Sequence, residues 1–161
     1  MPFDSAYSPS VGGSTKVSEY QKLRDNDKAL AGGDVYDFGG SIGAFVTDTD
    51  WVDLPDSWEL EMYAQDRSGR SVYLEVNVLA RMADGSAWSG TVTASLRLFN
   101  LTAGAAVASS QVDIVLSVAD TRTRSLSSTL TLSATTDRHK IQIKTSAAAR
   151  MVAGRARVVI R

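Results

Sequence analysis

The sequence predicts an all-β protein: an antiparallel, jelly-roll-like β-sandwich of about eight strands, preceded by an extended N-terminal arm and one short α-helix. Three observations favour this class. Apolar and polar side chains alternate along short segments between residues 35 and 160, turn-forming residues separate those segments, and a single segment has helical spacing. Alternation with a period of two is typical of half-buried antiparallel strands, and many short strands indicate two packed sheets.

The connections between the expected strands differ in length, which favours the Greek-key wiring of a jelly roll. An immunoglobulin-like sandwich is the alternative. It is disfavoured because the chain lacks the cysteine pair of that fold and has no clear tyrosine corner.

Residues 1–38 are predicted to form an arm and an attachment helix, and residues 39–161 the sandwich domain. Residues 1–15 are rich in Ser, Gly and Pro and contain too little apolar surface to fold alone. A helix is expected at about 18–30, because Ser18 and Gln21 form a capping box and Gly32 follows the last turn. Its apolar stripe is narrow, so it either lies across its own domain or docks on another chain. The residues expected to bind that partner are Phe3, Tyr7, Val17, Tyr20, Leu23, Arg24 and Leu30.

The clearest strand lies within residues 88–102, where the alternation is almost without error. Its inward face is expected to carry Val92, Ala94, Leu96 and Leu98. The opposite face carries Thr91, Thr93, Ser95 and Arg97, which indicates a strand with one side on the core.

The other strands are predicted from the same alternation. Residues 35–38 and 42–46 are short candidates, followed by an acidic loop at 47–56. Residues 58–64 would place Trp58, Leu60 and Met62 inward, and residues 66–69 turn the chain. Later strands are expected at 72–80, 106–118, 126–134, 138–145 and 151–160. Their inward residues are Val72, Leu74, Val76, Val78, Ala80, Val112, Ile114, Leu116, Val118, Leu126, Leu130, Leu132, Ile141, Ile143, Val152, Ala156, Val158 and Ile160.

The composition excludes several classes of function. A length of 161 residues suits one domain with an appendage, and a net charge of -1 provides no field to hold nucleic acid or an acidic membrane. The chain has no cysteine and one histidine, so thiolate and histidine-rich metal sites are excluded. No apolar run reaches membrane-spanning length, and the N-terminus lacks the parts of a signal peptide. We therefore expect a soluble protein made in the cytoplasm, with no cofactor and with neither nucleic acid nor membrane as partner.

Residues that could perform chemistry are few. Asp48, Asp50, Asp53 and Asp56 are weak candidates for a calcium site, because their spacing departs from that of an EF-hand loop. Glu59 and Glu61 share a strand face, as any outward pair does, and His139 has the parity of a residue at the edge of the core. No motif supports nucleophilic catalysis or phosphate binding. The sequence thus predicts no catalytic residue and no enzyme.

Arginines are concentrated near the C-terminus, whereas acidic residues dominate the first two thirds of the chain. Such polarity lets the acidic flank of one copy meet the basic flank of another. The expected subunit contacts are Arg122, Arg124, Arg155 and Arg157. We expect a closed homotrimer in which each copy repeats one heterologous contact; a mixed soluble surface is the alternative.

Two stretches resemble bacteriophage structural proteins. The helix TKVSEYQKLRDNDKAL is similar, through Val17, Tyr20, Leu23, Arg24 and Asp25, to the helix that opens many tail-fibre, head-fibre and decoration proteins. The strand and turn RLFNLTAG is similar to one in their β-sandwich domains, through Arg97, Leu98, Phe99, Asn100, Thr102 and Gly104, with Phe99 replacing the usual tyrosine. The resemblance implies a non-enzymatic virion component, assembled in the host cytoplasm, often trimeric and bound to other capsid or tail proteins.

Two other functions remain open at the level of sequence. A carbohydrate-binding module would use exposed aromatic side chains such as Trp51, Tyr63 and Tyr73 as platforms for a glycan in host or surface recognition. A glycan-processing enzyme is supported only by the carboxylates.

Overall fold

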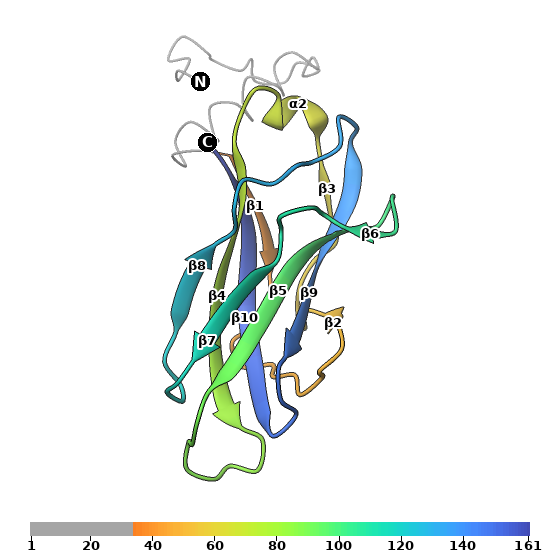
Figure 1. Cartoon of the computed structure of the whole chain (residues 1–161). Coiled ribbons are helices and arrows are strands. Elements are labelled where there is room, and N and C mark those ends of the chain that lie inside the picture. The colour runs from red at the N-terminus through yellow and green to blue at the C-terminus, as the bar shows by residue number, and fades with distance from the viewer. Residues whose placement is uncertain (1–33) are drawn as a thin grey trace, which may run out of the picture.

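Two antiparallel sheets face each other in the computed structural model, which describes residues 34–161 (Figure 1). The four-stranded sheet has the order β1 (Asp34–Gly39), β10 (Arg150–Ile160), β4 (Val72–Met82), β8 (Thr123–Leu126). The six-stranded sheet has the order β2 (Val52–Asp53), β9 (Asp137–Thr145), β5 (Val92–Asn100), β6 (Ala105–Ala106). Within it, β3 (Leu60–Met62) also pairs with β9, and β7 (Val112–Leu116) with β5. One helical turn, α2 (Ala64–Arg67), lies between β3 and β4.

The strand pairing is nested along the described chain. The first strand pairs with the last, β1 with β10; the next ones, β2 and β3, pair with β9; then β4 pairs with β8, and β5 with β7 in the middle. A long hairpin rolled up on itself produces this nesting, which is the wiring of a jelly roll. The predicted jelly-roll sandwich is therefore confirmed.

The core lies between the sheets and consists of residues that alternate along the long strands. The predicted inward faces of β4, β5, β9 and β10 are all buried, including Leu74, Leu96 and Ile143, which have no exposed surface. Their side chains form one apolar cluster, to which Val112, Ile114 and Leu116 of β7 also belong. Burial of apolar surface is worth about 25 cal/mol per Å², so this cluster is the main source of stability.

Three expectations for residues 42–69 are wrong. Residues 42–46 form a turn and a short connection, and only Val46 bridges to a strand, at Val152. Trp58 is 67% exposed because it precedes β3 and its indole lies over Gly39 instead of entering the core. Residues 66–67 belong to α2 and are buried, so the turn begins only at Ser68.

Two further predicted strands also differ: 106–118 is divided between β6 and β7, and 126–134 is mostly the connection that follows β8, with an isolated bridge at Thr131. Val118 is exposed because β7 ends at Leu116 and the chain then crosses to the other sheet. Leu126 is exposed because it pairs with Glu75, and residues opposite each other across a ladder share a face of the sheet. Only Leu130 of the predicted strand 126–134 is buried, and Leu132 packs partly against the core.

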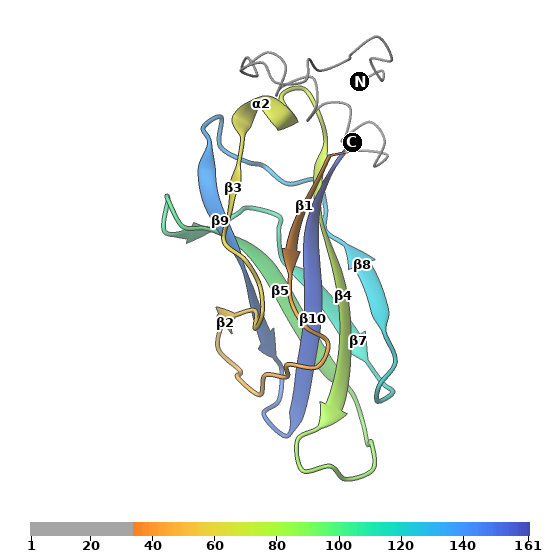
Figure 2. The same cartoon turned by 180° about the vertical axis from the view of Figure 1, so that it is seen from behind.

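Both termini of the described chain lie at the same end of the sandwich, beside α2 (Figure 2). Asp34 pairs with Ile160, and the backbones of Ser71 and Arg161 exchange two hydrogen bonds. The turn between β4 and β5, at Asp84 and Gly85, lies at the opposite end. Because β1 pairs with β10, residues 34–38 form part of the sheet, although they were assigned to the arm. The rest of the predicted arm, residues 1–33, with its helix and the seven partner-binding residues, lies outside the described residues.

Within residues 34–161, no helix has the length and apolar character needed to cross a membrane.

His139 is buried more deeply than the edge position predicted for it. It is 1% exposed, its Nδ1 lies 3.0 Å from the carbonyl oxygen of Asp137, and its Nε2 has no hydrogen-bond partner in the described structure. Burial, followed by repulsion from Arg67, lowers the pKa of the imidazole below its ordinary value of 6.5.

The lowered pKa of His139 predicts a loss of stability in mild acid. Below about pH 6.5 the unfolded chain takes up a proton that the folded chain does not, so the free energy of unfolding falls as the pH drops toward the folded-state pKa. His139→Leu should flatten this decline in urea titrations between pH 7.5 and 5. If the free energy of unfolding depends on pH equally in the two proteins, folding does not lower the pKa of His139.

Candidate functional site

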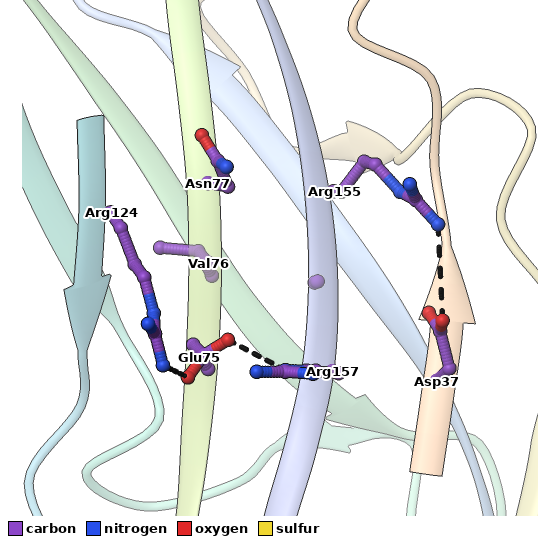
Figure 3. Close-up of a pocket in the computed structure, with 8 residues that line it drawn as sticks. Asp37, Glu75, Val76, Asn77, Arg124, Arg155 and Arg157 are labelled. Atoms are coloured by element: carbon purple, nitrogen blue, oxygen red, sulfur yellow. Dashed lines mark hydrogen bonds and ion pairs between the residues drawn. The ribbon is translucent and has the colours of Figure 1, made fainter. Parts of the chain in front are cut away.

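The outer face of the four-stranded sheet carries two adjacent charged rows (Figure 3). In one row Asp37, Arg157 and Glu75 are register partners across β1, β10 and β4. In the next row Arg155 and Asn77 are partners across β10 and β4, with Arg124 of β8 opposite Asn77. Residues two apart on a strand point to the same face, so the antiparallel register brings the two rows together.

Glu75 is the anchor of this cluster. Its side chain is 9% exposed, and Arg157 Nε donates to its Oε1 at 2.6 Å while Arg124 Nη2 donates to its Oε2. Burial alone would raise the pKa of the carboxyl group, but the hydrogen bonds from Arg157 and Arg124 outweigh that effect and lower it below 4.5. One carboxylate thus holds two guanidinium groups from different strands.

The rows enclose an open depression of about 450 Å³. On the side of the depression formed by β1 and β10, Arg155 Nη2 lies 3.8 Å from the Asp37 carboxylate, and both side chains are more than half exposed. Asn77 Oδ1 is buried and has no hydrogen-bond partner among the described residues. An unsatisfied buried acceptor costs about 1–3 kcal/mol.

Three of the four arginines predicted as subunit contacts therefore meet at one place. Arg124, Arg155 and Arg157 line the depression, whereas Arg122 lies in the connection between β7 and β8. Their role as subunit contacts stays a prediction. Glu75 alternates with the predicted inward residues Leu74 and Val76, which places it on the outer face, but the local pattern contains no signal that it would meet Arg157, 82 positions away.

A second surface, on the six-stranded sheet, combines cations with aromatic rings. The guanidinium of Arg97 lies 4.1 Å from the Trp51 ring centre, and Lys144 Nζ lies 4.8 Å from it. Arg97 also donates two hydrogen bonds to Gln142 Oε1, at 2.9 and 2.7 Å. Neither Arg97 nor Lys144 forms an ion pair with a carboxylate of residues 34–161, so this surface, defined by Trp51, Arg97 and Lys144, keeps uncompensated positive charge.

The aromatic side chains considered for glycan binding do not share one surface. Trp51 lies beside the six-stranded sheet, Tyr73 points outward from β4 of the four-stranded sheet with Arg161 over its ring at 5.8 Å, and Tyr63 lies between β3 and α2. The predicted set therefore does not form a single platform.

The aspartates considered for calcium do not converge either. Within residues 34–161, no three His, Cys, Asp or Glu side chains are grouped closely enough to hold a metal ion. Asp53 instead accepts a hydrogen bond from Lys140 Nζ at 2.8 Å. Glu59, which precedes β3, pairs with Arg138 of β9, and both side chains are exposed.

Arg67 performs a structural role that the sequence did not indicate, because it was read as part of a turn. The buried guanidinium donates to the carbonyl oxygens of Met62 at 2.8 Å and Ser133 at 2.6 Å, and also to that of Thr135. It thereby joins the end of β3 to the connection between β8 and β9. Burial lowers the pKa of Arg67, although nearby Asp137 opposes this effect.

No protein-family model matches the chain, and no curated protein matches it in sequence. Two solved structures are similar to it. One is of infectious bursal disease virus, Gx strain, with 15% identity, a TM-score of 0.36 and coverage of 80% of this chain and 30% of that chain. The other is arabinose-bound MgGH51 α-L-arabinofuranosidase, with 14% identity, a TM-score of 0.29 and coverage of 82% and 24%. The chain spans less than a third of either protein, and likenesses this weak carry no functional argument.

The Glu75 cluster predicts a measurable contribution to stability. Glu75→Gln should lower the free energy of unfolding at pH 7 by about 1–3 kcal/mol, because two guanidinium groups lose their charged acceptor. The folded-state pKa lies below 4.5, so the wild-type advantage is complete above that pH and is lost as the pH falls through the folded-state pKa. Denaturant titrations at pH 7 and pH 3 measure both effects. Glu61→Gln, at an exposed position on β3, is the matched control and should change little.

Proposed function

We propose that the chain is a non-enzymatic structural subunit of a bacteriophage or phage-like particle, of the decoration, head-fibre or fibre-adaptor type. It attaches through residues 1–33 and projects its jelly roll. The arm, helix and strand motifs that resemble such proteins support this function. The main structural support is the position of Asp34, where residues 1–33 join the sandwich. It lies at the α2 end, beside the C-terminus. The same proposal places the protein in the virion, with other virion proteins as its partners. It also assigns a homotrimer that contacts neither nucleic acid nor membrane.

The long strands run from the end of the sandwich where Asp34 lies to the opposite end, so they determine the direction in which the domain projects. β4 and β10 each contain 11 residues, which corresponds to about 35 Å at the rise of an extended strand. An arm held on a particle therefore places the turn between β4 and β5 far from the attachment point. The arginine cluster and the Trp51 surface lie on the sides of this projection and remain accessible to neighbouring molecules.

The composition of the arm also favours a partner. Ordering a segment costs about 1–2 kcal/mol per residue in backbone entropy, and apolar residues are sparse among residues 1–33. Aromatic and leucine side chains such as Phe3, Tyr20 and Leu23 can offset this cost if they enter pockets of another protein.

This function predicts that attachment and folding can be separated. Tyr20→Ser with Leu23→Ser should abolish co-sedimentation with particles while the melting temperature of the sandwich stays within about 2 °C of wild type. A variant lacking residues 1–33 should melt cooperatively at a similar temperature and also fail to attach. Particles that bind the double variant as well as wild type would contradict the proposal, and a molten truncated protein would show that the sandwich depends on the arm.

A carbohydrate-binding module is the second candidate function, and the Trp51 surface favours it. Arg97 and Lys144 carry positive charge with no carboxylate partner among the described residues, beside an indole ring. Such a surface suits a glycan that carries carboxylate groups, through charge-assisted hydrogen bonds.

If this second function holds, wild-type protein should bind an immobilised polyuronate, and binding should weaken as salt is raised. Arg97→Gln with Lys144→Gln should lose the binding, whereas Arg81→Gln, a cation that already pairs with Asp120, should retain it. Equal binding by all three proteins, or by none, would exclude this surface as a glycan site.

A further inference from the structure

Six large apolar side chains are exposed within residues 34–161, and they are divided between two edges of the sandwich. The β1–β3 edge, formed by β1, β3 and the residues flanking β3, carries Val35, Trp58 and Tyr63. The β7–β8 edge, formed by β7, β8 and their connection, carries Val115, Val118 and Leu126. Figures 1 and 2 show these two edges on opposite sides of the molecule.

The charges of the two edges differ. The segment that supplies the β1–β3 edge, residues 34–66, contains nine Asp and Glu and no Lys or Arg. The segment that supplies the β7–β8 edge, residues 112–126, contains two Asp and two Arg, and within the described chain Arg122 is exposed without an ion pair. Like charges oppose the pairing of two β1–β3 edges, whereas Arg122 favours the approach of the β7–β8 edge to the acidic one.

Both edges of the four-stranded sheet are also open. Among the named strands, β1 pairs with β10 and β8 with β4; Ser57 and Trp58 bond to β1 only at Phe38 and Gly39, so residues 34–37 of β1 and the outer side of β8 have no neighbouring strand in the described structure. Every neighbouring pair in this sheet is antiparallel, and three such steps from β1 to β8 make these two strands antiparallel as well. An open strand edge is a ready site for association with another chain.

We propose that the β7–β8 edge of one copy binds the β1–β3 edge of a second copy, in a heterologous head-to-tail contact that repeats to close a ring. Val35 and Leu126, which both point to the outer face of the four-stranded sheet, then come together, and Arg122 approaches carboxylates of the neighbour. This inference deepens the proposed function, since it assigns the surfaces through which the structural subunit assembles, and it rests on no contact with the particle.

The absence of cysteine makes the contact testable with single substitutions. Val35→Cys lies on the β1–β3 edge and Leu126→Cys on the β7–β8 edge, and both positions are 41% exposed. A mixture of the two full-length variants, treated with a short bis-maleimide, should give a covalent dimer that contains one copy of each. Each variant alone should give almost none. A chain carrying both substitutions should give a ladder that ends at the ring size, expected to be three.

A cross-link between the two cysteines of one chain is not expected, because β10 and β4 lie between positions 35 and 126. Three inter-strand spacings separate them by about 14 Å, which is too far for a disulfide, so oxidation of the doubly substituted chain in place of the bis-maleimide links only different copies. Ser86→Cys, exposed in the turn after β4, is the matched control and should not link to Leu126→Cys. Val118→Asp should shift the sedimenting species to monomer without changing the melting temperature, because this side chain is 57% exposed.

Two results would overturn the contact. A dimer formed by Leu126→Cys alone, as readily as by the mixture, would show an isologous contact between two β7–β8 edges. A monomer that gives no mixed dimer at any concentration would show that the edges do not associate. Neither result depends on particle attachment, so failure of the contact is distinguishable from failure of the proposed function, which the Tyr20 and Leu23 variant tests.

Discussion

The 11-residue antiparallel ladder between β4 and β10 is the contact on which the rest of the structure depends. Its inner face supplies Leu74, Val76 and Val158 to the core, and its outer face places Glu75 opposite Arg157. The ladder also fits closely against the other sheet. A Cβ atom on Gly154 would lie 3.3 Å from Leu96 and 3.3 Å from Val78, so glycine lets β10 approach both neighbours. A shift of one residue in the register of β10 against β4 would turn the core side chains of the shifted strand to the outer face and its charged side chains to the core.

The sequence was informative wherever one face of a strand meets the core. β4, β5, β9 and β10 have that property, so their alternation predicted the buried residues and the fold class. It was less informative at the margins of the sheets. Trp58, Val118 and Leu126 continue an apolar alternation, yet they lie beyond a strand end or on an outer face, where alternation is no longer tied to burial.

The candidate site was predictable only in part, for a related reason. The spacing of Arg155 and Arg157 indicates a shared face, and the concentration of arginines indicates a basic surface. Their meeting with Glu75 and Arg124 depends on the register of β10, β4 and β8, which are distant in sequence. Arg67 and His139 illustrate the same limit, because their burial depends on segments that are distant in the chain: Arg67 bonds to Ser133, and His139 lies between Leu60 and Asn100 in the sheet.

The two proposals constrain each other through strand direction. In the proposed contact, β8 of one copy adjoins β1 of the next, and these strands are antiparallel within a single sheet. A neighbour whose strands keep the same orientation therefore continues the antiparallel alternation, and repetition gives a ring whose axis runs along the strands. Each copy then presents its α2 end, where Asp34 joins residues 1–33, on the same side of the ring. Several arms acting together bind far more tightly than one, because after the first attachment the others are already concentrated at the surface. Head-to-tail assembly thus makes weak individual arms sufficient for attachment, whereas a twofold contact with its axis across the strands would direct half of the arms away from the particle.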